Sequence, residues 1–198
     1  MADAPPAPPL VLGSRSPQRK AILEQLHIPF DVVPPRYDEE TPAAGDPAQI
    51  AREHAGAKAR SVAPQADDQP VLGVDTVVAL DGVIFGKPRD AADAERMLEQ
   101  LSGKTHVVIS GLCLHTRAWE IVEHEATNVA FRELTPRDLA AYVASGEWGG
   151  RAGAYAIQGL GANLVRRIEG DYLNVVGLPA ALLVRLLAER FAGVYGFG

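Results

Sequence analysis

The chain has 198 residues, 47% of them hydrophobic, which is enough to form the core of one globular domain. Its formal net charge of −6 argues against a nucleic-acid partner, and no stretch approaches the roughly 20 apolar residues that would imply a membrane partner. A single cysteine, Cys113, excludes a disulfide framework, and its apolar neighbours favour a buried, inert thiol.

Both ends of the chain differ in composition from its middle. Residues 1–9, MADAPPAPP, lack the basic and apolar regions of a signal peptide and predict a short disordered leader. Residues 10–191 contain no repeat or long linker and predict one domain, followed by a C-terminal tail at 192–198. Together these features favour a cytoplasmic protein.

Predicted strands and helices alternate along the domain. In chain order we expect a strand at 10–12, a helix at 17–26, a strand at 30–33, a helix at 47–62, strands at 71–80 and 83–85, a helix at 91–101, strands at 105–116 and 121–131, a helix at 136–145, a strand at 164–168 and a helix at 179–191. The two long strands form an antiparallel pair. This order predicts an α/β fold with a mixed sheet.

The first strand leads into a helix start with an unusual charge, LVLGSRSPQRK. Ser16 is a suitable N-cap and Pro17 suits the first helical position. Arg19 and Lys20 then add positive charge where the helix is already electropositive. A bound phosphate at Ser14 and Arg19 would explain this pattern, and a surface helix start with solvated cations would explain it equally well.

The strand at 71–80, VLGVDTVVAL, contains an acidic residue, Asp75, which is costly to bury without a partner. A paired structural charge, a metal ligand and a general base are three alternative explanations. Gly73 and Asp75 are expected to break the strand, and Thr76 then lies where a strand end opens onto a cleft. Because active sites favour such strand ends, a functional role is the preferred interpretation.

Two lysines and an acidic loop are weaker candidates. Lys87, before Pro88, could contact phosphate or balance Asp75, although a solvated lysine has the same pattern. Lys58 lies late in a helix, where cations are expected for helix stability alone. Glu40, in the acidic stretch DEE, could bind a magnesium ion, although solvated acidic loops are more common.

The stretch GRAGAYAIQGLG, residues 150–161, allows close backbone approach to a ligand or forms a tight structural turn. Gln158 could there hold a base edge, a ribose or a phosphate. The sequence contains no GxxxxGK[ST] motif and no paired-histidine motif, which argues against a P-loop NTPase and a zinc site.

The order of these motifs is more specific than any one of them. GSRSPQRK, DEETP, LGVDTVV, GKP, LSGKTH, GEWGGRAGAYAIQG and IEGDYLNVVGLP together resemble the Maf family of nucleoside triphosphate pyrophosphatases, over residues 10–187. The resemblance implies a fold like that of inosine-triphosphate pyrophosphatases, with an elongated mixed β-sheet, flanking helices and two lobes around a central cleft. It also implies hydrolysis of a nucleoside triphosphate to its monophosphate and pyrophosphate, a divalent cation (Mg²⁺ or Mn²⁺), and a homodimer.

The resemblance assigns roles to residues at matching motif positions. It implies catalytic roles for Asp75, Lys58 and Lys87, metal binding by Asp75 and Glu40, and substrate binding by Ser14, Ser16, Arg19, Thr76 and Gln158. Thr76 and Gln158 resemble the branch that acts on dTTP and UTP, whereas Gln18 stands where that branch usually has arginine. Gln18, Thr76 and Gln158 are therefore the expected specificity residues, and the preferred nucleotide stays open between dTTP, UTP and modified nucleotides.

Two other functions fit the same motifs. A nucleotide-binding regulator of septum formation would keep Ser14, Arg19 and Gln158 without needing Asp75. A housecleaning enzyme would act on modified nucleotides, with a role in cell-division arrest. The presence of both Asp75 and Lys87 favours an enzyme.

Overall fold

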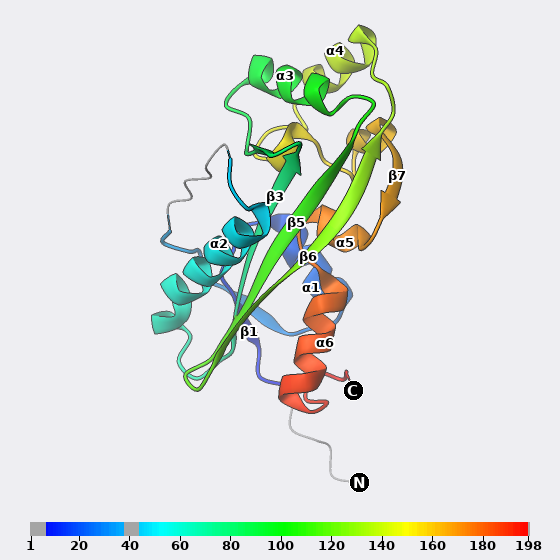
Figure 1. The fold of residues 1–198 in the computed structure, drawn as a ribbon. Helices are drawn as coiled ribbons and strands as arrows, with labels where there is room; N and C mark the ends of the chain where they lie inside the picture. Colours follow the sequence, from blue (N-terminus) through cyan, green and yellow to red (C-terminus); the bar gives the residue numbers. More distant parts are fainter. Residues whose placement is uncertain (1–6, 38–43, 198) are drawn as a thin grey trace.

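A computed structural model describes residues 7–37 and 44–197. The elements are β1 (Leu10–Leu12), α1 (Pro17–Gln25), β2 (Phe30–Val32), α2 (Pro47–Val62), the 3₁₀ turn η1 (Ala63–Gln65), β3 (Val71–Leu80), β4 (Val83–Phe85), α3 (Ala91–Leu101), β5 (Thr105–His115), β6 (Glu120–Phe131), α4 (Pro136–Ser145), the 3₁₀ turns η2 (Ala152–Ala154) and η3 (Leu160–Leu164), β7 (Val165–Glu169), α5 (Tyr172–Val176) and α6 (Ala180–Phe191) (Figure 1). Each predicted strand and helix is confirmed to within one residue at each end. The short helix α5 was not predicted.

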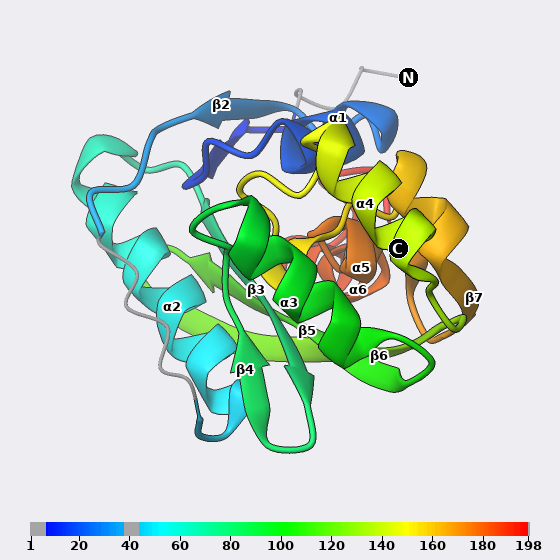
Figure 2. The same cartoon turned by 90° about the horizontal axis from the view of Figure 1, so that it is seen from above.

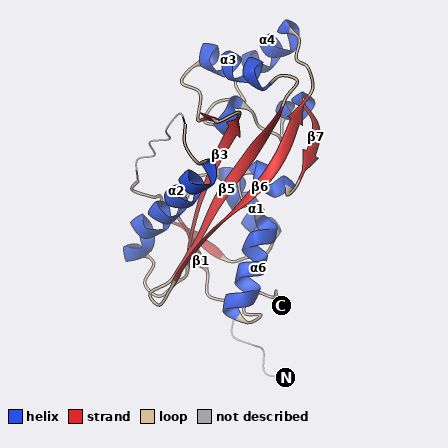
Figure 3. Cartoon of the chain, viewed as in Figure 1, coloured by secondary structure: helices blue, strands red, loops and turns tan. Residues whose placement is uncertain are grey.

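The described strands form one mixed sheet in the order β2-β1-β3-β5-β6-β7, with β4 also paired to β3. β1 runs parallel to β2 and β3, whereas the remaining pairs are antiparallel, including the predicted pair β5 and β6. Helix α2 covers one face of the sheet, and α1, α5 and α6 lie on the other face (Figures 2 and 3). The predicted α/β class with flanking helices is confirmed.

Strand β3 corrects one expectation. Gly73 and Asp75 do not break it, because β3 continues without interruption and pairs with β5 from Val71 to Ala79. Gly73 instead faces α2, where a Cβ atom would clash with the backbone and side chain of Ala59 within 2.9 Å. The glycine therefore permits close helix–sheet packing, and Asp75 lies in the middle of a strand rather than at its end.

An opening nevertheless forms beside Asp75, for a reason of topology. On the edge of β3 away from β5, β1 pairs only as far as Leu72, and β4 pairs only from Val78. Between these two positions no other described strand pairs with β3. The middle of β3 thus borders a gap in the sheet although the strand itself is continuous.

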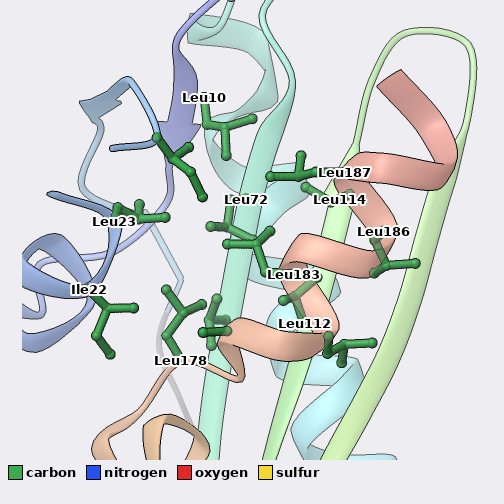
Figure 4. Packing of buried hydrophobic residues seen from close by; sticks show 14 of the residues in the cluster. Leu10, Ile22, Leu23, Leu72, Leu112, Leu114, Leu178, Leu183, Leu186 and Leu187 are labelled. Carbon is green, nitrogen blue, oxygen red and sulfur yellow. The ribbon is translucent and has the colours of Figure 1, made fainter. Parts of the chain in front are cut away.

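Two large hydrophobic clusters lie toward opposite ends of the sheet. One joins β1 and α1 to the start of β3 and to α6, and includes Leu10, Leu72 and Leu183 (Figure 4). The other joins α3 and α4 to β4, β5 and β6, and includes Leu98 and Phe131. The division into two lobes that the resemblance implies stays a prediction. Cys113 is buried in a third cluster under α2, where burial raises the pKa of its thiol to about 12, as expected of an inert cysteine.

The division into leader, domain and tail stays a prediction. At both ends, however, described residues contact the first cluster. Tyr195 is largely buried, and its hydroxyl donates a hydrogen bond of 2.9 Å to the Pro8 carbonyl. Among the described residues, no helix has the length and apolar character needed to cross a bilayer.

His106 lies inside the second cluster and is almost completely buried, with 1% of its surface exposed. Its Nε2 atom is 2.9 Å from the Tyr155 hydroxyl, and its ring makes edge contacts with Phe131 and Tyr155. Burial lowers the pKa of His106 to about 4, because the charged imidazolium loses its hydration.

The lowered pKa of His106 makes the stability of the fold depend on pH. The unfolded chain binds a proton at His106 near its ordinary pKa of 6.5, and the folded protein does so only near 4. The contribution of neutral His106 to the free energy of unfolding is therefore fully present above about pH 6.5. The free energy of unfolding falls by about 2 kcal/mol between about pH 7 and pH 5. Urea unfolding at both values should show that loss in the wild type and a smaller loss in His106→Phe. Equal losses in the two proteins would contradict the assignment.

Candidate active site

A cleft of about 810 Å³ opens at the gap beside β3. Its walls come from the β1–α1 loop, α2, the middle of β3, the β4–α3 connection, the glycine-rich segment and the end of α5. All but one of the predicted site residues line it, namely Ser14, Ser16, Gln18, Arg19, Lys58, Asp75, Thr76, Lys87 and Gln158. The exception, Glu40, lies outside the described residues.

The charge of the cleft is opposite to that of the chain. Among its described lining residues, five side chains are basic and two are acidic, namely Arg15, Arg19, Lys58, Lys87 and Arg151 against Asp75 and Glu147. The chain as a whole carries a formal charge of −6. A concentration of positive charge in one cleft of an acidic protein favours a small polyanionic ligand.

Asp75 and Lys58 form a buried ion pair at the base of the cleft. The Lys58 Nζ atom donates a hydrogen bond of 2.5 Å to Asp75 Oδ1, and each residue is only 4% exposed. Burial of two charges is tolerated because each compensates the other. Of the three explanations for Asp75, the structure shows the paired charge, while the general base and metal ligand stay predictions.

Arg19 is fixed by hydrogen bonds to three different parts of the chain. Its guanidinium donates to Ser14 Oγ at 3.0 Å, to the Gly177 carbonyl at 2.8 Å and to Thr76 Oγ1 at 3.3 Å. Thr76 Oγ1 in turn lies 2.8 Å from the buried Ser110 hydroxyl on β5. The network holds the helix start of α1 against the sheet and keeps the charge of Arg19 at the cleft.

The predicted N-cap of α1 is confirmed and also involves Gln18. Ser16 Oγ accepts a hydrogen bond of 3.4 Å from the Arg19 backbone N–H and donates one of 3.2 Å to Gln18 Oε1. The amide of Gln18 is thereby held beside the first turn of α1, on the cleft wall. A substitution at this position changes the polar surface that a ligand meets.

Lys87 is exposed on the connection between β4 and α3. Asp93 holds that connection, because its Oδ2 atom accepts hydrogen bonds of 3.2 Å from both the backbone N–H and Nε of Arg89. Hydrogen bonds from Arg96 and Arg89 lower the pKa of Asp93 to about 2. The loop is also joined to the glycine-rich segment by a hydrogen bond from the Gly153 N–H to the Gly86 carbonyl.

The glycine-rich segment forms another wall of the cleft. It turns at Gly153, whose φ is +69° and whose missing side chain leaves room for Val78 of β3. Gln158 is exposed on this wall, and Tyr155 and Ile157 add apolar surface beside it. An apolar surface with one amide at its edge is suited to a nucleobase or sugar.

Sequence reasoning missed Arg151 and Glu147 on the cleft wall. Arg151 lies between glycines in GGRAG, so a cation within a glycine-rich stretch was an available signal. Glu147 gave no such signal. The backbone N–H groups that it binds, those of Leu160 and Gly161, lie 13 and 14 residues later, too far along the chain to form a local motif. Arg15, directly before the N-cap of α1, is exposed and also lines the cleft.

Comparison with known proteins agrees with the motif order. The family model described as "Maf-like protein" matches residues 9–190. The chain belongs to the Maf family. It is 46% identical over 192 residues to a dTTP/UTP pyrophosphatase of Deinococcus radiodurans, covering 97% of each chain. It is 48% identical over 189 residues to one of Moorella thermoacetica, covering 94% of this chain and 97% of that one.

A solved structure, that of the Ham1 protein of Staphylococcus aureus, aligns with a TM-score of 0.44 and 16% identity. The alignment covers 62% of this chain and 71% of that one.

The divalent cation expected for this Maf protein can be compared with the available ligands. Within the described ranges, no group of three or more His, Cys, Asp or Glu side chains could hold a metal by itself. Mg²⁺, however, is commonly held by one or two carboxylates together with substrate phosphates and water. The Asp75 carboxylate lines the cleft and is compatible with a cation held in that way.

Proposed function

We propose that this protein is a nucleoside triphosphate pyrophosphatase, which converts a nucleoside triphosphate and water to the monophosphate and pyrophosphate. One observation carries the proposal, namely a carboxylate, Asp75, held by Lys58 within a cleft that is otherwise mostly cationic. The names of relatives about 45% identical over nearly the whole chain support the same activity.

In the proposed mechanism, Asp75 acts as the general base. Its carboxylate accepts a proton from a water molecule while the water oxygen forms a bond to the α-phosphorus. The bond from the α-phosphorus to the bridging oxygen breaks, and pyrophosphate leaves with that electron pair. Lys87 and Arg19 stabilise the negative charge that develops on the phosphate oxygens, and Lys58 keeps the Asp75 carboxylate in position.

Asp75 is also the described residue best suited to hold the proposed divalent cation, with Glu40 assigned beside it by the family resemblance. Such a cation, Mg²⁺ or Mn²⁺, would neutralise phosphate charge during the reaction.

The proposed substrates are dTTP and UTP, with modified pyrimidine nucleotides as the alternative. The names of the relatives, dTTP/UTP pyrophosphatases, support this choice, as do Thr76 and Gln158 in the expected motif positions. Gln18 carries no charge where arginine is usual in this branch, which removes one charge-assisted contact and is expected to broaden the choice of nucleotide.

A nucleotide panel tests the proposal directly. Initial rates of pyrophosphate release with Mg²⁺ should be measured on dTTP, UTP, CTP, 7-methyl-GTP, 5-methyl-UTP and pseudo-UTP. We expect kcat/KM for dTTP and UTP to exceed that for 7-methyl-GTP by at least about tenfold. Tight nucleotide binding without turnover would refute the enzyme and support the regulator of septum formation.

We also propose a cytoplasmic homodimer without a nucleic-acid or membrane partner. The negative net charge supports the absence of a nucleic-acid partner. In the described residues β7 pairs with β6 only from Asn128 onward, so the earlier part of β6 offers an edge for a second copy. Sedimentation equilibrium should give a mass near twice the 21.1 kDa of one chain.

A further inference from the structure

Glu147 is an acidic residue on the wall of a cleft proposed to bind a polyanion. A carboxylate in that position repels phosphate groups, so binding alone does not explain it. Its hydrogen bonds provide an explanation. Glu147 Oε1 accepts a bond of 3.0 Å from the Leu160 backbone N–H, and Oε2 accepts one of 3.3 Å from that of Gly161.

These two bonds connect the ends of one chain segment, which we call the 147–161 loop. Between its ends lie Arg151, Tyr155 and Gln158, all on the cleft wall. Because Gln158 is exposed, its position depends on the backbone on either side of it. The bonds that Glu147 accepts hold the backbone at Leu160 and Gly161, only two and three residues beyond Gln158.

Gly159 gives independent support for this bridge. The three atoms nearest to a Cβ built on Gly159 are the carboxylate atoms of Glu147, all within 2.7 Å. Its φ of −110° and ψ of −141° lie outside the usual β and α regions, so the backbone also favours glycine here. A side chain at position 159 would in addition displace the Glu147 carboxylate.

We propose that Glu147 is a positioning residue, which closes the 147–161 loop and thereby sets the place of Gln158 for nucleotide recognition. This inference rests on the proposed pyrophosphatase function. It assigns Glu147 no contact with the reacting phosphate, so its loss acts on substrate binding and selectivity rather than on the chemical step.

Kinetics of Glu147→Ala should separate these effects. We expect KM for dTTP and UTP to rise about tenfold, while kcat stays within about threefold of the wild-type value. The ratio of kcat/KM for dTTP and UTP to that for 7-methyl-GTP should decrease. Glu147→Gln keeps one acceptor oxygen and should recover part of the wild-type KM. Glu99→Gln, which removes the same charge from an exposed position on α3, is the control and should leave the kinetics unchanged.

A double-mutant cycle with Gly159→Ala tests the bridge itself. Gly159→Ala should raise KM at least as much as Glu147→Ala does, and the double variant should be no worse than Gly159→Ala alone, because both changes remove the same contact. Effects that multiply in the double variant would overturn the proposal, as would a kcat loss in Glu147→Ala larger than its KM change.

Hydrogen exchange distinguishes failure of this inference from failure of the proposed function. The amides of Leu160 and Gly161 should exchange faster in Glu147→Ala than in the wild type, whether or not the protein hydrolyses nucleotides. If exchange at both amides is unchanged, the bridge is refuted. If exchange changes and the wild type has no turnover, the bridge holds and only the proposed function fails.

Discussion

Replacing Asp75 with asparagine is expected to lower kcat for nucleoside triphosphate hydrolysis by about a hundredfold or more. Asparagine has the same size and can still accept a hydrogen bond from Lys58, but it cannot take a proton from water. Initial rates on dTTP and UTP at saturating Mg²⁺ measure the effect. A kcat within about threefold of the wild-type value would remove Asp75 from its role as the base.

A matched control makes that result specific. Asp81 lies exposed in the turn between β3 and β4, with a φ of +52° that asparagine also tolerates. Asp81→Asn removes one carboxylate from the same strand pair without touching the cleft, so it should retain wild-type kinetics. Because Asp75→Asn leaves the Lys58 charge buried without its partner, thermal unfolding must show that this variant is folded at the assay temperature.

Features encoded by neighbouring residues could be predicted from the sequence. Helix N-caps are one example, namely Ser16, Asp46, Asp90 and Thr135. Each cap accepts a hydrogen bond from a backbone N–H only two or three residues later, so the nearby sequence is enough to indicate it. The order of the family motifs also picked out residues that the fold brings to one cleft, since every predicted site residue except Glu40 lines it, although spacing alone could not have brought them together.

The structural roles of Gly73 and Lys58 depend on tertiary packing. Gly73 resembled a strand break, yet it lies where α2 crosses the sheet, and only the helix position reveals that. Lys58 resembled an ordinary cation near a helix end, yet its partner lies 17 residues later on a different element. Neither role has a local sequence signal, since the interacting group comes from elsewhere in the chain.

The unpredicted helix α5 is a third case. Its five residues are too few to show helical periodicity, and they include two adjacent valines, which favour strands. Asp171 caps it, accepting a hydrogen bond of 2.7 Å from the Leu173 N–H. The carbonyl of Gly177, which ends this helix, accepts the bond from Arg19, so α5 contributes to the site.

Replacing Lys58 with methionine is expected to destabilise the protein by about 3–5 kcal/mol. Methionine keeps most of the length of the unbranched side chain, so packing changes little, but it leaves the Asp75 carboxylate buried without a counter-charge. The free energy of unfolding, from urea titrations at neutral pH, measures the loss. Arg60→Met, which removes a cation from an exposed ion pair on the same helix, should cost less than about 1 kcal/mol.

Combining Lys58→Met with Asp75→Asn separates the structural role of the pair from its catalytic role. With both charges removed, neither is left unpaired, so the double variant should recover much of the stability lost in Lys58→Met. Its kcat should nevertheless stay about a hundredfold or more below that of the wild type, because no base is left. Recovered stability with recovered turnover would show that the ion pair serves the fold alone and that the base lies elsewhere in the cleft.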